Sequence, residues 1–198
     1  MNIDKHFGDA YDIVKRSLLG RLAGLGLWCA HPMFTHDATD DAANRFAQLL
    51  GVQIISRERL HVGTNREAYL GVCKQPSHVF LDPDTGLKVG RGNRPEYLFT
   101  DELVRLAEAR PEFLTLVFDQ SLQRGTEENQ VQSKLEHLAT RGVSGPGYVS
   151  QVAFILVGRD GSLVKRAHEA ITGQSDLPLS RFVSATPSNT APDCVKTP

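Results

Sequence analysis

The chain of 198 residues is poor in features that define several protein classes. It has only three cysteines, Cys29, Cys73 and Cys194, which lie far apart and include no C-x-x-C pair. An odd, dispersed set of this kind gives no disulfide framework, so we expect a reduced, cytoplasmic environment. Cys29 lies within an apolar run, which favours a small core residue over a nucleophile.

Long apolar runs are missing too. No stretch approaches the ~20 apolar residues of a membrane span, and the first residues, M-N-I-D-K-H-F-G-D, contain no apolar signal core. The formal charge of -1 offers no bulk attraction to nucleic acid or to an anionic membrane. We therefore expect a soluble protein without a membrane partner, in which any polyanion would have to meet a local basic patch.

What the chain does have is a regular alternation of two patterns. Short apolar runs, each predicting a buried strand, occur at 27–30, 52–55, 79–81, 113–118 and 149–157. Amphipathic stretches with capping residues, each predicting a helix, occur at 9–25, around 43–50, at 65–72, from 100 onward and at 126–138. This order predicts an α/β protein with a mainly parallel, Rossmann-like sheet covered by helices on both faces.

The C-terminal part departs from this alternation. Asp160-Gly161 is a good hairpin turn into a strand at 162–164, so we expect a C-terminal hairpin. Residues 165–171 fit either a continuation of that strand or a short helix. From Ser184 onward Ser, Thr, Pro and Asn prevail. We therefore expect a single domain over 1–183 and a disordered tail over 184–198.

The most informative stretch is 78–89, H-V-F-L-D-P-D-T-G-L-K-V. Its apolar run stops at Asp82, and Pro83 favours extended backbone at that residue. In extended backbone Asp82 and Asp84 leave the same side of the chain about 6.6 Å apart, so they could share a divalent cation or hold a hydrogen-bond donor of the substrate. The structural alternative, an Asx-type turn at Asp84 with Asp82 as a cap, has about even weight.

A second strand end has similar chemistry. The run 113–118 ends in Asp119-Gln120, and ligands of parallel α/β sheets bind outside the carboxyl ends of the strands, where the strand order switches. This rule places Asp82, Asp84, Asp119 and Gln120 at one edge, with the loop after Ala30 nearby. It makes Asp119 and Gln120 candidate substrate-binding residues.

Charged residues elsewhere have ordinary explanations that compete with function. Asp12 precedes Lys15 by one helical turn, which favours an ion pair on the exposed face of the first helix, and Asp9 suits its positive end. The acids of the 33–41 loop could ligate a metal but fit the first turn of the next helix better. The 90–95 loop, with two arginines, could contact phosphate, although a solvated loop is favoured.

Two resemblances add to this interpretation. Residues 8–15, G-D-A-Y-D-I-V-K, and 80–86, F-L-D-P-D-T-G, resemble a family of uncharacterised bacterial and phage proteins with G-D-x-x-D-x-x-K and F-x-D-P-D-x-G signatures. The element order is distantly similar to the large-subunit ribosomal RNA adenine-N6 methyltransferases. That similarity places D-P-D-T where those enzymes have D-P-P-Y and implies that Asp82 accepts a hydrogen bond from an adenine amino group. Asp84 and Thr85 depart from that motif, and no glycine-rich loop follows the 27–30 strand.

Two classes of function follow. The first is an enzyme acting on a nucleotide or nucleic acid, either methyltransferase-like with S-adenosylmethionine or holding magnesium through Asp82 and Asp84 for phosphodiester chemistry. In it Asp82, Asp84 and Lys15 are catalytic, while Asp9, Asp12, Asp119, Gln120 and Arg124 bind substrate. Lys15 or Arg124 would stabilise developing negative charge. The second class is a binding or interaction module without chemistry, as the missing glycine loop would allow.

Overall fold

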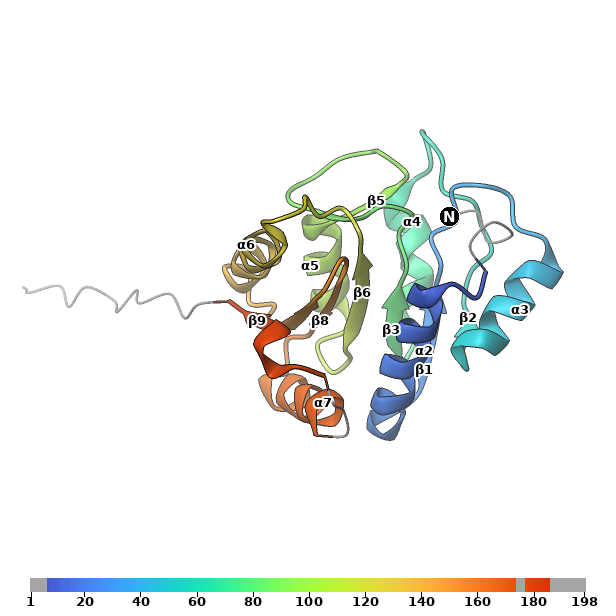
Figure 1. Cartoon of the computed structure of the whole chain (residues 1–198). Coiled ribbons are helices and arrows are strands. Elements are labelled where there is room, and N and C mark those ends of the chain that lie inside the picture. Colours follow the sequence, from blue (N-terminus) through green and yellow to red (C-terminus); the bar gives the residue numbers. More distant parts are fainter. Residues whose placement is uncertain (1–6, 174–176, 186–198) are drawn as a thin grey trace, which may run out of the picture.

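The computed structural model describes residues 7–173 and 177–185. Their main element is a seven-stranded sheet with the order β2-β1-β3-β6-β8-β7-β9 (Figure 1). Strands β2, β1, β3 and β6 are parallel, and antiparallel pairing follows from β6 to β8, β7 and β9. The strands are β1 Trp28–His31, β2 Gln53–Ile54, β3 His78–Leu81, β6 Thr115–Asp119, β7 Pro146–Val149, β8 Ala153–Val157 and β9 Phe182–Ser184.

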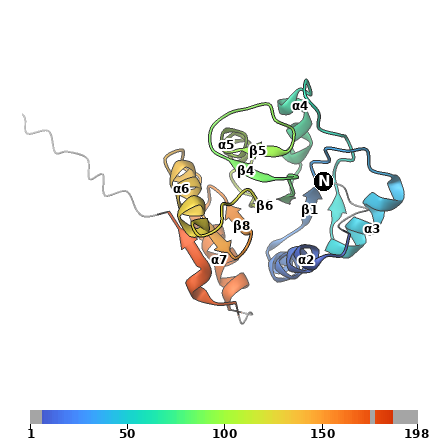
Figure 2. The same cartoon turned by 45° about the horizontal axis from the view of Figure 1, so that its top comes forward.

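Helices cover both faces of this sheet, so the molecule has three layers (Figure 2). One face packs against α2 Ala10–Leu22, α3 Asp40–Leu50 and α7 Gly161–Thr172. The other packs against α4 Arg66–Gly71, α5 Thr100–Ala109 and α6 Glu127–Ala139. Short 3-10 turns η1 Ala23–Leu25, η2 Val72–Lys74 and η3 Leu179–Arg181 and a two-stranded parallel sheet, β4 Gly86–Lys88 with β5 Tyr97–Phe99, complete the described part. The predicted α/β class with helices on both faces is therefore confirmed.

Each strand sends alternate side chains to opposite faces, because the side-chain period of a strand is two residues. In β3, Phe80 packs on the α2 side, whereas Val79 and Leu81 pack on the α5 side. In β6, Phe118 packs on the α2 side and Val117 on the other. The residues that follow continue this alternation. Asp82 consequently faces α2, while Asp119 faces α6.

The predicted C-terminal hairpin is wrong. Asp160 caps α7: its carboxylate accepts hydrogen bonds from the backbone N–H groups of Ser162 and Leu163, at 2.9 and 3.1 Å. An Asp-Gly pair suits a helix start as well as a turn, and the residues after it bury Leu163, Val164, Ala167 and Ile171 at helical spacing. The undecided residues 165–171 are therefore helical.

The hairpin of this region lies earlier in the chain. The predicted single strand at 149–157 contains the last residue of β7, a turn at 150–152 and β8, and the two strands pair antiparallel around that turn. Ser184, the first residue of the predicted tail, belongs to β9, and residues 186–198 lie outside the described residues. Within the described residues, no helix combines the length and apolar character needed to cross a membrane.

Candidate functional site

A buried ion cluster joins the first helix to the end of β3. The Lys15 Nζ atom donates to Asp82 Oδ2 at 2.9 Å and to Asp12 Oδ1 at 3.1 Å. The three residues are between 1% and 4% exposed. The predicted ion pair of Asp12 with Lys15 is present, but its predicted place on the exposed face is wrong, because both residues lie on the packed face of α2 with Leu18, Leu19 and Leu22.

The electrostatics of this cluster favour a charged lysine. Burial alone would lower the pKa of Lys15, but the carboxylates of Asp82 and Asp12 outweigh it, and the pKa lies above its ordinary value of 10.5. Burial raises the pKa of Asp82, and the Lys15 ammonium opposes that effect. The Lys15 ammonium also lies 4.4 Å from the ring centroid of Phe118. The charge of Lys15 therefore interacts with groups inside the protein, namely the two carboxylates and the aromatic ring.

A cavity of about 170 Å³ lies over this cluster, between the start of α2 and the ends of β3 and β6. Three carboxylates and one ammonium are in its wall, next to two aromatic rings whose centroids are 5.7 Å apart. The lining residues are Asp9, Tyr11, Asp12, Lys15, Asp84, Phe118 and Gln120. We call it the α2 cavity. It is rich in hydrogen-bond acceptors and has flat apolar walls.

Asp84 connects this cavity to two neighbouring loops. Its Oδ2 atom accepts a hydrogen bond from Thr35 Oγ1 at 3.0 Å, and its backbone carbonyl accepts one from the Gln120 side-chain amide. The loop after β1, the end of β3 and the end of β6 therefore meet at this point. Asp84 and Lys15 line the cavity, whereas Asp82 does not and is reached only through its ion pair with Lys15.

Asp9 and Asp12 have structural contacts as well as places in the cavity wall. Asp9 caps α2 by accepting from the backbone N–H groups of Tyr11 and Asp12 at 2.9 and 3.1 Å. Asp12 Oδ2 accepts from the Gly8 N–H at 3.0 Å. These bonds fix the direction in which α2 enters the site.

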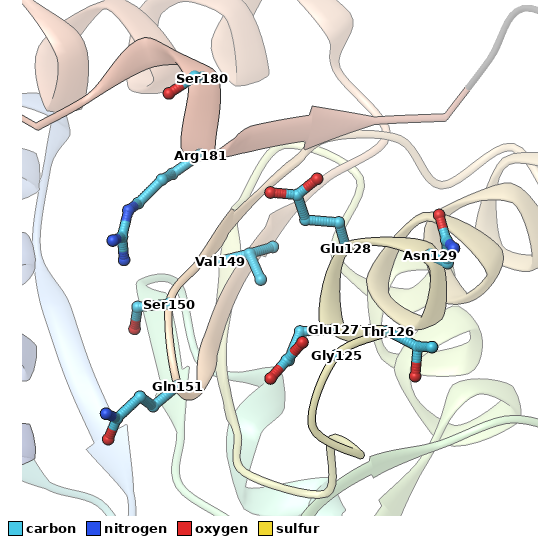
Figure 3. Close-up of a pocket in the computed structure, with 10 residues that line it drawn as sticks. All are labelled: Gly125, Thr126, Glu127, Glu128, Asn129, Val149, Ser150, Gln151, Ser180 and Arg181. Atoms are coloured by element: carbon cyan, nitrogen blue, oxygen red, sulfur yellow. The ribbon is translucent and has the colours of Figure 1, made fainter.

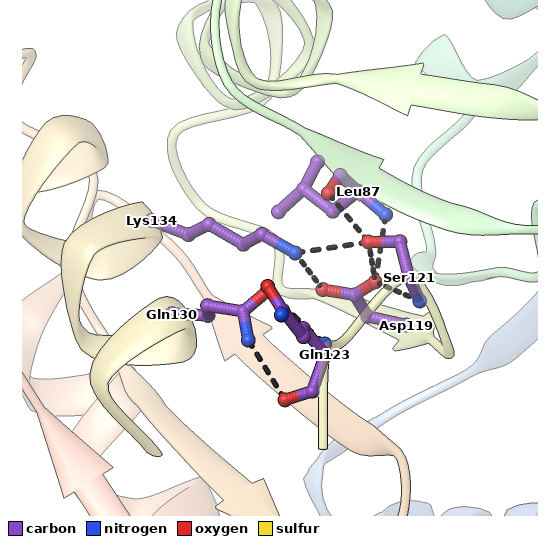
Figure 4. A network of polar contacts seen from close by, with 6 residues as sticks. All are labelled: Leu87, Asp119, Ser121, Gln123, Gln130 and Lys134. Carbon is purple, nitrogen blue, oxygen red and sulfur yellow. Dashed lines mark hydrogen bonds and ion pairs between the residues drawn. The ribbon is translucent and has the colours of Figure 1, made fainter. Parts of the chain in front are cut away.

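Asp119 belongs to a different network on the opposite face of the sheet (Figure 4). Its Oδ2 atom accepts from Lys134 Nζ at 2.6 Å. Its Oδ1 atom accepts from the backbone N–H groups of Leu87 and Ser121 and from the Ser121 hydroxyl, at 3.1, 3.0 and 2.6 Å. Asp119 is fully buried. Its acceptors are used within the protein, where they tie β4 and α6 to the end of β6, and it lines none of the cavities described here.

A larger cavity of about 700 Å³ lies beyond the ends of β7 and β8 (Figure 3). Arg181, Ser150 and Gln151 are on one side, and Glu127 and Glu128, from the first turn of α6, are on the other. The predicted substrate-binding residue Arg124 is exposed in the loop that precedes α6. It lines neither this cavity nor the α2 cavity.

The residues at the edge do not fit the predicted magnesium site. An ammonium, not an open position, lies against the Asp82 carboxylate, and Asp84 points to Thr35. No group of three or more His, Cys, Asp or Glu side chains suited to a metal ion occurs in the described part of the chain. This holds also for the acids of the 33–41 loop, where Asp37 and Asp40 pair with Arg59 and Arg57.

The turn after β1 also lacks the features of a glycine cradle for a nucleotide-type cofactor. Its residues are Pro32, Met33 and Phe34, and the last two are wholly buried. Met33 adopts a φ of 49°, a left-handed conformation that is uncommon for a residue with a side chain. Side chains thus fill the space that backbone glycines leave open in dinucleotide-binding turns. S-adenosylmethionine does not fit this turn.

The sequence analysis missed two parts of the site. One is the pairing of Lys15 with Asp82, 67 residues away in sequence. The other is the aromatic wall of Tyr11 and Phe118. The alternation of side chains along β3 and β6 would have indicated the aromatic wall, because it sends Phe118 and Asp82 to the same face of the sheet. Comparison of the chain with protein-family models, curated proteins and solved structures finds no match.

Proposed function

We propose that the protein is a Rossmann-like enzyme that acts on an amino-bearing base of a nucleotide or nucleic acid. The α2 cavity is its base-binding site. The observation that carries the proposal is the combination, in one cavity wall, of acidic acceptors and two neighbouring aromatic rings beside a buried Asp-Lys-Asp cluster.

The position of the cavity supports this proposal. Chain order runs from β1 to β2 on one side and from β3 to β6 on the other, so the strand order reverses beside β1. In open α/β sheets ligands bind outside the carboxyl ends of strands at such a reversal. The α2 cavity lies at the ends of β3 and β6, and Thr35 brings the loop after β1 to it.

The size and chemistry of the cavity favour a base over a phosphate. Its volume of about 170 Å³ is below the ~300 Å³ typical of sites that enclose a whole small molecule, so a single ring fits and the rest of a nucleotide stays outside. Carboxylates repel phosphate but accept hydrogen bonds from amino groups. Stacking on aromatic rings contributes ~1–3 kcal/mol per base.

Each residue then has a defined task. Asp84 accepts a hydrogen bond from the amino group, and Gln120, bonded to the backbone of Asp84, fixes that loop. Tyr11 and Phe118 form the aromatic wall against which the ring packs. The ion pair of Lys15 with Asp82 holds α2 against the end of β3. In the D-P-D-T motif, we thus assign the hydrogen bond from the amino group to Asp84 and not to Asp82.

The test compares adenosine with inosine by isothermal titration calorimetry. The two nucleosides differ by the exchange of an amino group for a carbonyl, so a site built for the amino group should bind adenosine at least tenfold more tightly. Asp84→Asn should reduce this preference, since an amide can donate to the carbonyl of inosine. Asp41→Asn, an exposed acid of α3, is the matched control and should change nothing.

Equal binding of the two nucleosides, or an unchanged preference in Asp84→Asn, would contradict the base-binding proposal. The enzymatic part has its own test. Incubation of the protein with adenosine or with adenosine-containing oligonucleotides should yield a product of altered mass, detected by mass spectrometry, and Asp84→Ala should yield none.

The alternative is a binding module without chemistry. The buried side chains of Met33 and Phe34 in the turn after β1 favour it, because they leave no glycine cradle there. Selective adenosine binding without any product of altered mass would decide for this alternative.

A further inference from the structure

Arginines from three separate segments gather around one cavity on the α5 side of the molecule. Arg91 comes from the loop between β4 and β5, which lies beside the start of α5 (Figure 2). Arg105 comes from α5 itself, and Arg141 follows the end of α6. The cavity has a volume of about 400 Å³. It is separate from the α2 cavity and shares no lining residue with it.

Asp101 contacts two of these arginines. Its Oδ2 atom accepts from Arg91 Nε at 2.7 Å, and its Oδ1 atom lies 3.9 Å from Arg141 Nη1 and 3.7 Å from His137 Nε2. The hydrogen bond from Arg91 holds the pKa of Asp101 below its ordinary value. The loop is fixed as well: the Gly90 N–H donates to Thr100 Oγ1 at 2.9 Å. One carboxylate thus positions Arg91 and Arg141 and makes no contact with Arg105 that would neutralise it.

The local charge balance is positive. Among the described residues, Arg105 forms no hydrogen bond or ion pair, and Glu108 pairs with Arg159 at 3.6 Å. Arg91, Arg105 and Arg141 line the cavity with two carboxylates, Asp101 and Glu108, which leaves an excess of one positive charge. The whole chain has a formal charge of -1. Positive charge is therefore concentrated here against the overall balance.

We propose that this cavity binds the phosphate group of a ligand. Each guanidinium presents five N–H donors in a planar fork that matches the oxygens of phosphate, and arginine is preferred wherever such bidentate recognition occurs. Three forks from different segments suit a tetrahedral group with several charged oxygens better than a planar carboxylate. The cavity is the local basic patch that a polyanion needs on a protein of nearly balanced charge.

The first test is calorimetric titration of the full chain with inorganic phosphate in a chloride buffer. Wild type should bind, and the double variant Arg105→Ala/Arg141→Ala should lose at least tenfold in affinity. Arg45→Ala, an exposed arginine of α3 paired with Asp41 at 3.9 Å, is the matched control and should bind as wild type does. Both substituted arginines are exposed, and thermal melting checks that each variant folds.

Two further probes distinguish the source of the phosphate group. A mononucleotide and a single-stranded oligonucleotide are titrated over a series of salt concentrations. If a nucleic acid backbone is the ligand, the oligonucleotide binds more tightly, and its log-log salt slope falls by about 0.7 for each phosphate contact that the double variant removes. If a nucleotide or free phosphate is the ligand, both nucleotide probes bind equally. Absence of phosphate binding, or binding that the double variant retains, would overturn the proposal. Adenosine has no phosphate, so failure here leaves the base-binding test unaffected.

Discussion

Lys15 is the residue on which the candidate site depends for its shape. Its ammonium satisfies two buried carboxylates, and removing one partner of a buried ion pair typically costs ~3–5 kcal/mol because the remaining charge stays buried. We expect Lys15→Met to lower the free energy of unfolding by that amount at pH 7, measured by urea denaturation. Lys165→Met, on the exposed face of α7, should change it by less than ~0.5 kcal/mol.

The same pair of variants gives a pH test. The pKa of Lys15 is raised in the folded protein. Its contribution to the free energy of unfolding is therefore fully present below pH 10.5 and is lost as the pH rises through the pKa of the folded state. The advantage of wild type over Lys15→Met should therefore be constant between pH 7 and 9 and shrink above 10.5. A variant as stable as wild type at pH 7 would show that the cluster does not hold α2.

His31 should make the fold sensitive to acid. It is completely buried beside Tyr69, with ring centroids 4.7 Å apart, and burial lowers its pKa to about 4. The unfolded chain takes up a proton near pH 6.5 while the folded chain does not, so stability is complete above 6.5 and falls between 6.5 and 4. The loss attributable to His31 is about 3 kcal/mol at most.

His31→Gln keeps an acceptor for the Met33 N–H, which bonds to His31 Nδ1 at 3.3 Å. Denaturant titrations at pH 7 and pH 4.5 should show a smaller loss of stability in this variant than in wild type. Burial also lowers the pKa of His78. The difference between the two proteins gives the part of the acid-induced loss of stability that comes from His31 alone. Equal losses in both proteins would show that His31 is protonated without penalty.

At the scale of the element, β4 reaches the main sheet only because Gly86 has no side chain. Its φ is +136°, and a Cβ atom at that position would lie 2.1 Å from Asp119 Oδ1. Gly86→Ala would displace the carboxylate that holds Lys134 and the Leu87 N–H. We expect a loss of ~2–4 kcal/mol, consistent with breaking a buried hydrogen-bonded network and adding backbone strain.

Gly20 provides the matched control for this prediction. It lies within α2, and an added Cβ would meet nothing within 4 Å. Gly20→Ala should therefore stabilise the protein by ~0.5–1 kcal/mol through helix propensity. Thermal unfolding of the two variants beside wild type gives both values. Two shifts in the same direction would contradict the account of β4.

The element scale also shows how far sequence reasoning reached. Periodicity and capping residues predicted most helices and strands, because an amphipathic helix such as α3 carries its caps, Thr39 and Gly51, in the sequence. These local patterns gave the wrong element at Asp160-Gly161, because the same dipeptide can form a turn or begin a helix and packing against distant residues decides between the two. The rule for strand ends placed Asp82 and Asp119 in one site, although their side chains point to opposite faces of the sheet, where each pairs with a different lysine.

At the scale of the whole molecule, the sequence predicted which strand ends lie close together but could not assemble the candidate site. Asp84, Gln120 and the loop after β1 meet there, as the rule for α/β sheets implies. The sequence offered a phosphate contact only in the 90–95 loop, which contains Arg91. The cluster itself could not be predicted, since Arg91, Arg105 and Arg141 belong to three segments that only the packing of α5 and α6 brings together. Spacing along the chain carries no signal for such a patch.

The central claim is that the α2 cavity receives an amino-bearing base, and NMR chemical-shift mapping with adenosine tests it most directly. The account predicts shifts of the backbone amides of Tyr11, Asp12, Asp84 and Gln120, with little change at Asp119 and Lys134 on the opposite face. Shifts confined to other regions, or no shifts at millimolar adenosine, would contradict it.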